Sequence, residues 1–125
     1  MTTVRGKYRG TTEYVHVLGE LVRTAQYRGL TTYQDVAVIM ALPMQGNLMG
    51  RELGQMLGEI AEDEVLAGRP MLSAVVVGVN GKPGSGFFSL AKDLGKITEG
   101  DNEQSFWEQE RDAVYAAWRR PLPKQ

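Results

Sequence analysis

Four acidic side chains that lie close together offer the most obvious chemistry in this sequence. They are Glu59, Glu62, Asp63 and Glu64. A metal-dependent hydrolase needs carboxylates that converge on a divalent ion, usually with a lysine nearby. The apolar stretch that follows, from Leu72 to Val77, adds no acid to the cluster. We therefore interpret these acids as a solvated helix face and not as a metal site.

The sequence lacks the residues that nucleophilic catalysis requires. The sequence contains no cysteine and one histidine, His16. One histidine does not make a metal site, and the hydroxyl of Ser73 has no base to activate it except His16. The stretch from Gly84 to Ser89 matches a dinucleotide-binding fingerprint only in part and fits a flexible turn better. The sequence thus predicts a protein that is not an enzyme and uses no metal or cofactor.

DNA contact is the chemistry that the polar residues favour. Asn47, Arg51 and Gln55 recur every four positions, so a helix places them on one face. Arginine and asparagine are side chains that read base edges or hold phosphates. Further candidate contacts lie elsewhere in the chain: Tyr33, Lys82, Arg5, Lys7 and Arg9. The alternative interpretation is that all these residues are ordinary polar surface residues that contact no DNA.

The charge of the chain is unevenly distributed. The formal net charge is −1. Residues 1–33 carry five basic and two acidic side chains, whereas residues 34–68 carry one basic and six acidic ones. An anionic partner is therefore expected to meet the N-terminal residues and the basic turn, and to avoid the acidic end of the long helix. The chain has no long apolar run and no signal-like N-terminus, which favours a cytoplasmic protein without a membrane span.

Helical periodicity and capping signals predict the elements that would position these residues. Apolar spacing predicts a helix over residues 12–28, a second that starts at Thr32, and a long one over residues 47–67 that Gly68 ends. Ser105 and Glu108 form a capping-box pattern that predicts the start of a last helix. One domain is expected from the length of 125 residues.

The segment between these helices carries the signals of a β-hairpin. Residues 71–79 are rich in β-branched side chains and predict a buried strand, and Asn80-Gly81 is a tight-turn signal. The residues from Phe87 to Leu94 are compatible with a return strand, a helical turn, or both. Helix, helix and glycine-rich hairpin is the order of a winged helix-turn-helix.

Three glycines, Gly50, Gly54 and Gly58, repeat every four residues in the long helix. Each is expected to cost about 1 kcal/mol of helix stability relative to alanine. Three in register indicate a face that another element or a ligand approaches closely. Tight packing against a neighbouring helix is the favoured interpretation.

Three segments resemble the DNA-binding domain of the alkylguanine-DNA alkyltransferases and their catalytically inactive alkyltransferase-like relatives. They are Gly29-Leu30-Thr31-Thr32-Tyr33-Gln34-Asp35-Val36-Ala37, Arg51-Glu52-Leu53-Gly54-Gln55-Met56-Leu57 and Val76-Val77-Gly78-Val79-Asn80-Gly81-Lys82-Pro83-Gly84. The resemblance implies that Tyr33 rotates the phosphate of a target nucleotide. It also implies that Arg51 replaces a flipped base in the stack, which offsets part of the cost of extrusion.

The same resemblance marks what is missing. The family's Pro-Cys-His-Arg falls on Leu72-Ser73-Ala74-Val75, so the alkyl acceptor, its activating histidine and the following arginine are all absent. The tryptophan that inactive relatives carry at the cysteine position is absent too. Alkyl transfer is therefore excluded, and a duplex-binding shape is what the resemblance leaves.

The sequence as a whole predicts an α+β fold, a mostly helical winged helix-turn-helix with a small β-hairpin wing and flanking N- and C-terminal helices. Residues 1–10 are expected to form a flexible basic arm, residues 11–120 the domain, and residues 121–125 a tail. The predicted function is non-enzymatic binding of double-stranded DNA.

A protein-interaction module, with self-association or a protein partner, is the alternative. Its docking surface would be the acidic helix end, the helix with Trp107 and Trp118, or a methionine-rich surface. The methionines concerned are Met40, Met44, Met49 and Met56.

Overall fold

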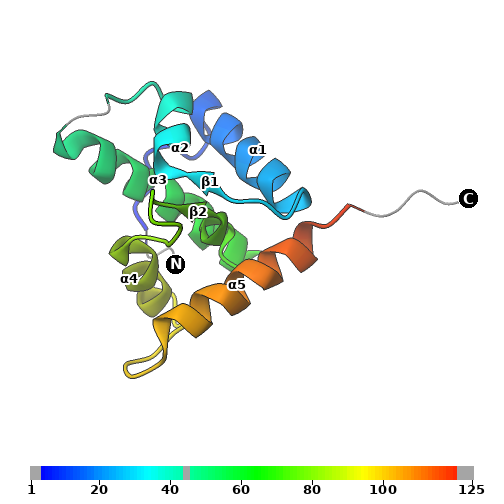
Figure 1. Cartoon of the computed structure of the whole chain (residues 1–125). Helices are drawn as coiled ribbons and strands as arrows, with labels where there is room; N and C mark the ends of the chain where they lie inside the picture. The colour runs from blue at the N-terminus through cyan, green and yellow to red at the C-terminus, as the bar shows by residue number, and fades with distance from the viewer. Residues whose placement is uncertain (1–3, 44–45, 121–125) are drawn as a thin grey trace, which may run out of the picture.

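The computed structural model describes residues 4–43 and 46–120, and these form a mostly helical α+β fold (Figure 1). The predicted first three helices are present as α1 (Thr12–Gln26), α2 (Tyr33–Ile39) and α3 (Asn47–Leu66). Thr32 caps α2 as predicted, because its side chain accepts a hydrogen bond from the amide of Asp35 at 3.1 Å. Gly68, with φ of +82°, follows the end of α3 in a conformation that glycine adopts freely.

The predicted β-hairpin is wrong. Residues Leu72–Val75 form a 3₁₀ turn, η1, and only Val76–Val77 form a strand, β2. This strand pairs in parallel with β1 (Thr31–Thr32), with Thr31 opposite Val76 and Thr32 opposite Val77. The chain then makes the predicted turn at Asn80-Gly81 and enters a helix, α4 (Ser85–Asp93), in place of a return strand.

The physical reason lies in the residues that follow the turn. Pro83 has no N–H group to offer a strand ladder. Phe87 and Ala91 are four residues apart and both buried, which is the spacing of one helix face. The glycine-rich stretch read as a flexible turn therefore opens a helix, and the fold carries no hairpin wing among its described residues.

The last helix, α5 (Glu103–Trp118), starts earlier than the capping-box pattern indicates. Its cap is Asn102, whose side chain accepts from the amide of Ser105 at 2.8 Å. Trp107 anchors α5 to the core, because its indole N–H donates to the carbonyl of Ala74 at 2.8 Å. Glu110 adds a second tie, since its carboxylate accepts from the amide of Met71 at 2.9 Å.

The core surrounds η1. Helices α1, α3 and α5 all contact this turn, and α5 crosses the lower face of the molecule in Figure 1. Fully buried side chains from each element fill the centre: Leu21, Met56, Ile60, Leu72, Val75 and Val114. Because η1 is enclosed on several sides, the apolar run that predicted a buried strand is accounted for by burial without a long strand.

The expected flexible arm lies against α3. Residues 4–9 are bound by carboxylates of that helix, and the side chain of Tyr8 is buried. Residues 1–3 and the expected tail at 121–125 lie outside the described residues. None of the helices in residues 4–43 and 46–120 combines the length and the apolarity needed to cross a membrane.

Candidate ligand cavity and nucleic-acid interface

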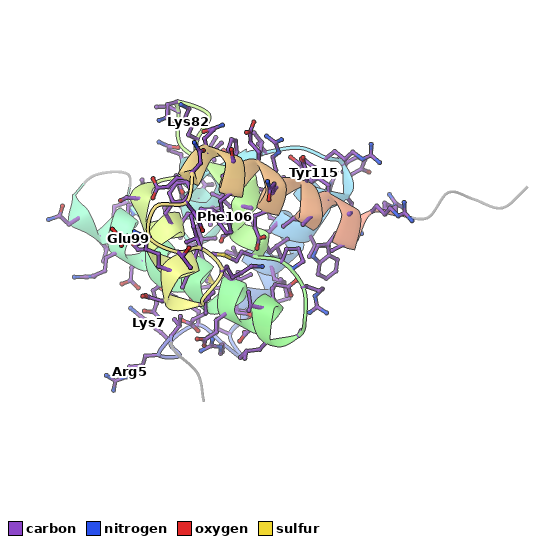
Figure 2. The ribbon with its side chains drawn as sticks, turned by 90° about the horizontal axis from the view of Figure 1, so that it is seen from below. Arg5, Lys7, Lys82, Glu99, Phe106 and Tyr115 are labelled. Carbon is purple, nitrogen blue, oxygen red and sulfur yellow. The ribbon has the colours of Figure 1, made fainter. Side chains whose placement is uncertain are left out.

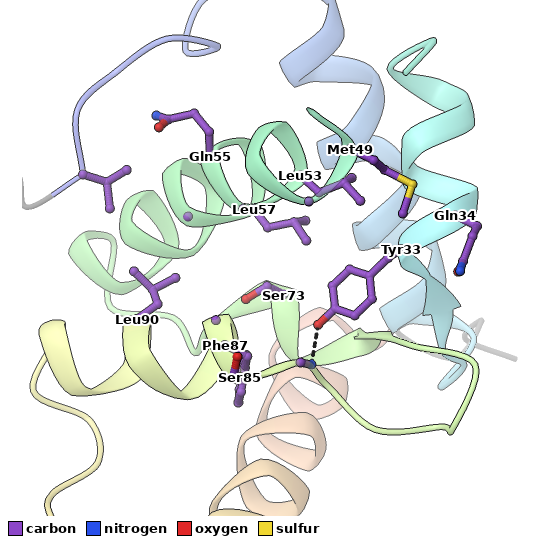
Figure 3. Close-up of a pocket in the computed structure, with 16 residues that line it drawn as sticks. Tyr33, Gln34, Met49, Leu53, Gln55, Leu57, Ser73, Ser85, Phe87 and Leu90 are labelled. Atoms are coloured by element: carbon purple, nitrogen blue, oxygen red, sulfur yellow. Dashed lines mark hydrogen bonds between the residues drawn. The ribbon is translucent and has the colours of Figure 1, made fainter. Parts of the chain in front are cut away.

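A cavity of about 530 Å³ opens between α3, α4 and the start of α2. Its wall on α3 is mostly apolar, with Met49, Leu53 and Leu57, and Phe87 and Leu90 of α4 also line it (Figure 3). No charged side chain lines it among the described residues. The volume falls within the range of about 300–1,000 Å³ that is typical of small-molecule sites.

Ser73 contributes an unsatisfied hydroxyl to this cavity. The residue is only 6% exposed, and its Oγ has no hydrogen-bond partner among the described residues. Figure 3 shows this side chain directed into the space between α3 and α4. A buried polar group normally has a partner, and one without a partner costs stability. Ser73 was read from the sequence as inert toward catalysis, and the cavity that it lines was not predicted.

The beginning of α4 forms another part of the cavity wall. Gly84, Ser85 and Gly86 all line it. The N-cap residue Gly84 has no side chain with which to cap α4. The backbone N–H groups of Ser85 and Gly86 donate to no acceptor in the described chain. The backbone N–H of Phe87 donates to the carbonyl of Gly84 at 3.1 Å. Free N–H groups at a helix start create a region of positive potential.

Tyr33 joins the cavity to the turn formed by residues 78–84. Its hydroxyl accepts a hydrogen bond from the amide of Gly84 at 2.8 Å, as the dashed line in Figure 3 shows. Burial raises the pKa of Tyr33 against the smaller, opposite effect of this hydrogen bond. The phenol therefore keeps its proton at neutral pH and is able to donate it to a further acceptor.

The glycine-bearing face of α3 lies at the cavity and is largely open. A side chain built at Gly50 or Gly54 would meet nothing within 4 Å, and both residues are exposed. Tight packing of these two glycines against another helix is therefore wrong. At Gly58 the added carbon would touch the side chain of Val4 at 3.7 Å, so the N-terminal segment closes that end of the stripe.

The acidic residues of α3 are not a solvated face, which corrects the sequence interpretation. Glu59 is fully buried and accepts from the amides of Lys7, Tyr8 and Arg9 at 2.9–3.0 Å. Glu62 is 2% exposed and accepts from Arg9 at 2.8 Å.

The remaining acids of α3 are paired as well. Asp63 accepts from the Nε of Arg9 at 2.9 Å. Glu64 pairs with Arg69 at 2.8 Å, and Glu52 pairs with Lys7 at 2.5 Å. The sequence does not reveal this arrangement because the partners of these acids, Arg69 excepted, lie about 50 positions earlier in the chain.

These contacts favour the charged form of the carboxylates. Hydrogen bonds from Lys7 and Tyr8 are the main causes that lower the pKa of Glu52, from 4.5 to about 2. For Glu59, burial acts to raise the pKa, but hydrogen bonds from Gln55 and from the backbone of residues 7–9 outweigh it and lower the value. Glu52 and Glu59 are therefore ionised at neutral pH, and Lys7, Arg9 and Arg69 offset three of the five formal negative charges on α3.

The predicted DNA-contacting residues divide into two groups. Arg5, Lys7, Arg9 and Gln55 lie together at the carboxylates of α3, and Gln55 donates to the carbonyl of Arg5 and to Glu59. Figure 2 shows Lys82 at the opposite end of the molecule from Arg5 and Lys7. A single basic face that includes the N-terminal segment and Lys82 is thus not formed.

Two further predicted contacts are exposed on α3. Asn47 is its first residue, and the Arg51 side chain is 73% exposed with one contact to Glu52 at 3.4 Å. His16 is exposed on α1. The part of the chain that the structure describes contains no group of three or more acidic, histidine or cysteine side chains with the geometry to hold a metal ion.

Several side chains of the predicted docking surfaces are buried in the fold. Trp107 is 4% exposed, Met40 is 5% exposed and Met56 is fully buried. Trp118 and Met49 pack partly against the core. Met44 lies outside the described residues. The acidic helix end is covered by residues 4–9 of the same chain.

Comparison with protein-family profiles, with characterised proteins and with solved structures found no match for this chain.

Proposed function

We propose that this protein binds double-stranded DNA without catalysing a reaction on it. The duplex contacts the exposed front half of α3 through Asn47 and Arg51, and the turn at residues 78–84 through Lys82. Tyr33 supports that turn because its hydroxyl accepts a hydrogen bond from the amide of Gly84. In this proposal the turn takes the place of the wing of a winged helix.

The partial charge compensation and burial of the acids on α3 is the observation that carries the proposal. The sequence alone indicates a helix whose acidic second half repels DNA. In that half Arg9 pairs with Glu62 and Asp63, and Arg69 pairs with Glu64, each within 3 Å. Arg51 is therefore the charge that α3 presents most openly to solvent, because its side chain is 73% exposed. Exposed glycines beside it allow the backbone of the helix to approach a phosphate chain closely.

Fluorescence anisotropy of a labelled duplex, titrated at two salt concentrations, tests the proposal. Affinity is expected to fall steeply with salt, because each neutralised phosphate adds about −0.9 to the slope of log K against log salt. Arg51→Ala should weaken binding and reduce that slope by about 1. Arg120→Ala is the matched control, since Arg120 is exposed beyond the end of α5.

Failure to bind any duplex at low salt would refute the proposal. Equal losses in Arg51→Ala and Arg120→Ala would remove α3 as the contacting element and leave only non-specific attraction.

A further inference from the structure

We propose that the cavity between α3 and α4 binds a small organic carboxylate, with the carboxylate at the beginning of α4 and an apolar body along α3. This site adjoins the proposed duplex-contacting surface, because Gly50, Gly54 and Gly84 line it, but its occupation does not require DNA. Three independent features of the cavity point to a ligand of this class: unsatisfied donors, an apolar wall and an open entrance.

Two backbone donors of the cavity wall lie at the start of α4, on the exposed residues Ser85 and Gly86. The amides of Ser85 and Gly86 have no acceptor in the described chain, and both residues line the cavity. The start of a helix favours a bound anion through its free N–H groups and the helix dipole. α4 has nine residues and therefore possesses a full first turn of such groups.

The hydroxyl of Ser73 gives the second, separate observation. It is buried, directed into the same cavity and without a partner (Figure 3). A hydroxyl held in this state is expected to satisfy its hydrogen bond with a ligand, because nothing in the surrounding protein does so. The proton of the Tyr33 hydroxyl adds another donor, since that oxygen already accepts from Gly84.

The remaining wall selects the body of the ligand. Leu53 and Leu57 of α3 face Phe87 and Leu90 of α4 across the cavity. No lysine or arginine lines it in the described part of the chain, so the backbone amides and hydroxyls have to hold the anion. An aromatic or aliphatic tail fits the leucine wall, so the ligand combines an anionic head with an apolar body.

The entrance lies at the exposed glycines of α3. Gly50 and Gly54 line the cavity, and a side chain at either position would have open space around it. A large side chain at Gly54 is therefore expected to fill the entrance without a clash in the fold. Leucine is also a better helix former than glycine.

The test uses 4-phenylbutyrate as the probe and its neutral amide, 4-phenylbutanamide, as the matched compound. Each is titrated into the isotope-labelled full chain at pH 7, and the backbone amide shifts of Ser85 and Gly86 are followed by NMR. 4-Phenylbutyrate is expected to shift the backbone N–H signals of Ser85 and Gly86 in a saturable manner. 4-Phenylbutanamide is expected to bind at least about tenfold more weakly.

Variants locate the site. Ser73→Ala should weaken binding of the acid by about 3–10-fold, the range for loss of one hydrogen bond. Its stability should be unchanged or raised, because the removed hydroxyl has no partner. Gly54→Leu should abolish binding, whereas Gly19→Leu should not, because Gly19 is an exposed helical glycine on α1 with equal space around it.

Equal binding of the acid and the amide would overturn the proposal, as would absence of saturable shifts at Ser85 and Gly86. Binding that survives Gly54→Leu would place the ligand elsewhere and also overturn it. None of these outcomes alters the expected effect of Arg51→Ala on the duplex, so this proposal and the DNA proposal fail separately.

Discussion

Single carboxylates fix the positions of several segments in this chain. Glu110 is the clearest case, because one 7% exposed side chain accepts from the amide of Met71 and pairs with Lys96 at 2.5 Å. It thereby joins α5 to the start of η1 and to the segment that follows α4. A buried acceptor that satisfies a buried amide is costly to lose, because the amide is then left without a partner.

Glu110→Ala is expected to reduce the free energy of unfolding by about 1–3 kcal/mol, the cost of a stranded buried donor. Glu110→Gln should cost less, because its side-chain carbonyl still accepts from Met71 and only the ion pair with Lys96 is lost. Urea denaturation measures both values. Glu108→Ala, on the exposed face of the same helix, is the control and should stay within about 0.5 kcal/mol of the wild type. A loss in Glu110→Ala no larger than in this control would contradict the prediction.

At the scale of elements, the turn at residues 78–84 depends on its own hydrogen bonds and on Tyr33. The amide of Gly78 donates to the carbonyl of Lys82 at 2.9 Å, and Gly81 has a φ of +78° that favours glycine. Added carbons at Gly78 and Gly84 would both touch the Tyr33 ring. The orientation of the turn toward the cavity is thus set by a residue that lies about 50 positions earlier.

Tyr33→Phe is expected to keep the ring contacts but free the amide of Gly84. Hydrogen exchange at Gly84 should accelerate by about 3–10-fold, the equivalent of one ordinary hydrogen bond. Tyr115→Phe removes a comparable bond, to the carbonyl of Gly29 at 2.7 Å, and should leave exchange at Gly84 unchanged. Unchanged exchange in Tyr33→Phe would show that the turn holds itself without the tyrosine.

The elements also show how far the sequence predicts this fold. Local signals were sufficient for α2, since Thr32 and Asp35 lie in the same turn and cap it directly. They failed at residues 71–88, because burial of η1 by three helices cannot be told from strand burial by composition alone.

The candidate site was predicted only in fragments. Glycine periodicity indicated a special face on α3, and the resemblance drew attention to Ser73, but neither signal showed that the two share a cavity. The ion pairs of the N-terminal segment were missed for a different reason: their partners are distant in sequence, so no local pattern joins Arg9 to Glu62 and Asp63.

At the scale of the whole molecule, residues 4–9 and the acids of α3 make stability depend on pH. The pKa of Glu52 is lowered to about 2 and that of Glu59 is also lowered. A carboxylate whose folded pKa is depressed contributes its full stabilisation above the unfolded pKa and loses it as the pH falls through the folded pKa. For Glu52 this window extends from about 4.5 down to about 2.

Urea midpoints at pH 6, 4 and 3 should therefore fall progressively with pH. Glu52→Gln should flatten this dependence, because the amide keeps an acceptor for Tyr8 but has no charge for Lys7 to neutralise. The control is Glu108→Gln, which alters an exposed carboxylate outside this cluster. A pH dependence in Glu52→Gln as steep as that of the wild type would show that the N-terminal contacts do not control acid stability.

The hydrogen bonds and ion pairs between α3 and residues 4–9 also have a consequence for the order of folding. Those residues are synthesised before α3, and the side chains that hold them lie 44–58 positions later. On the ribosome the segment has no docking surface until the whole of α3 has emerged. Contacts of such long sequence separation form late, after loop closure has been completed. Attachment of residues 4–9 is therefore expected to be among the last steps of folding, and it closes the Gly58 end of the glycine stripe only once α3 is in place.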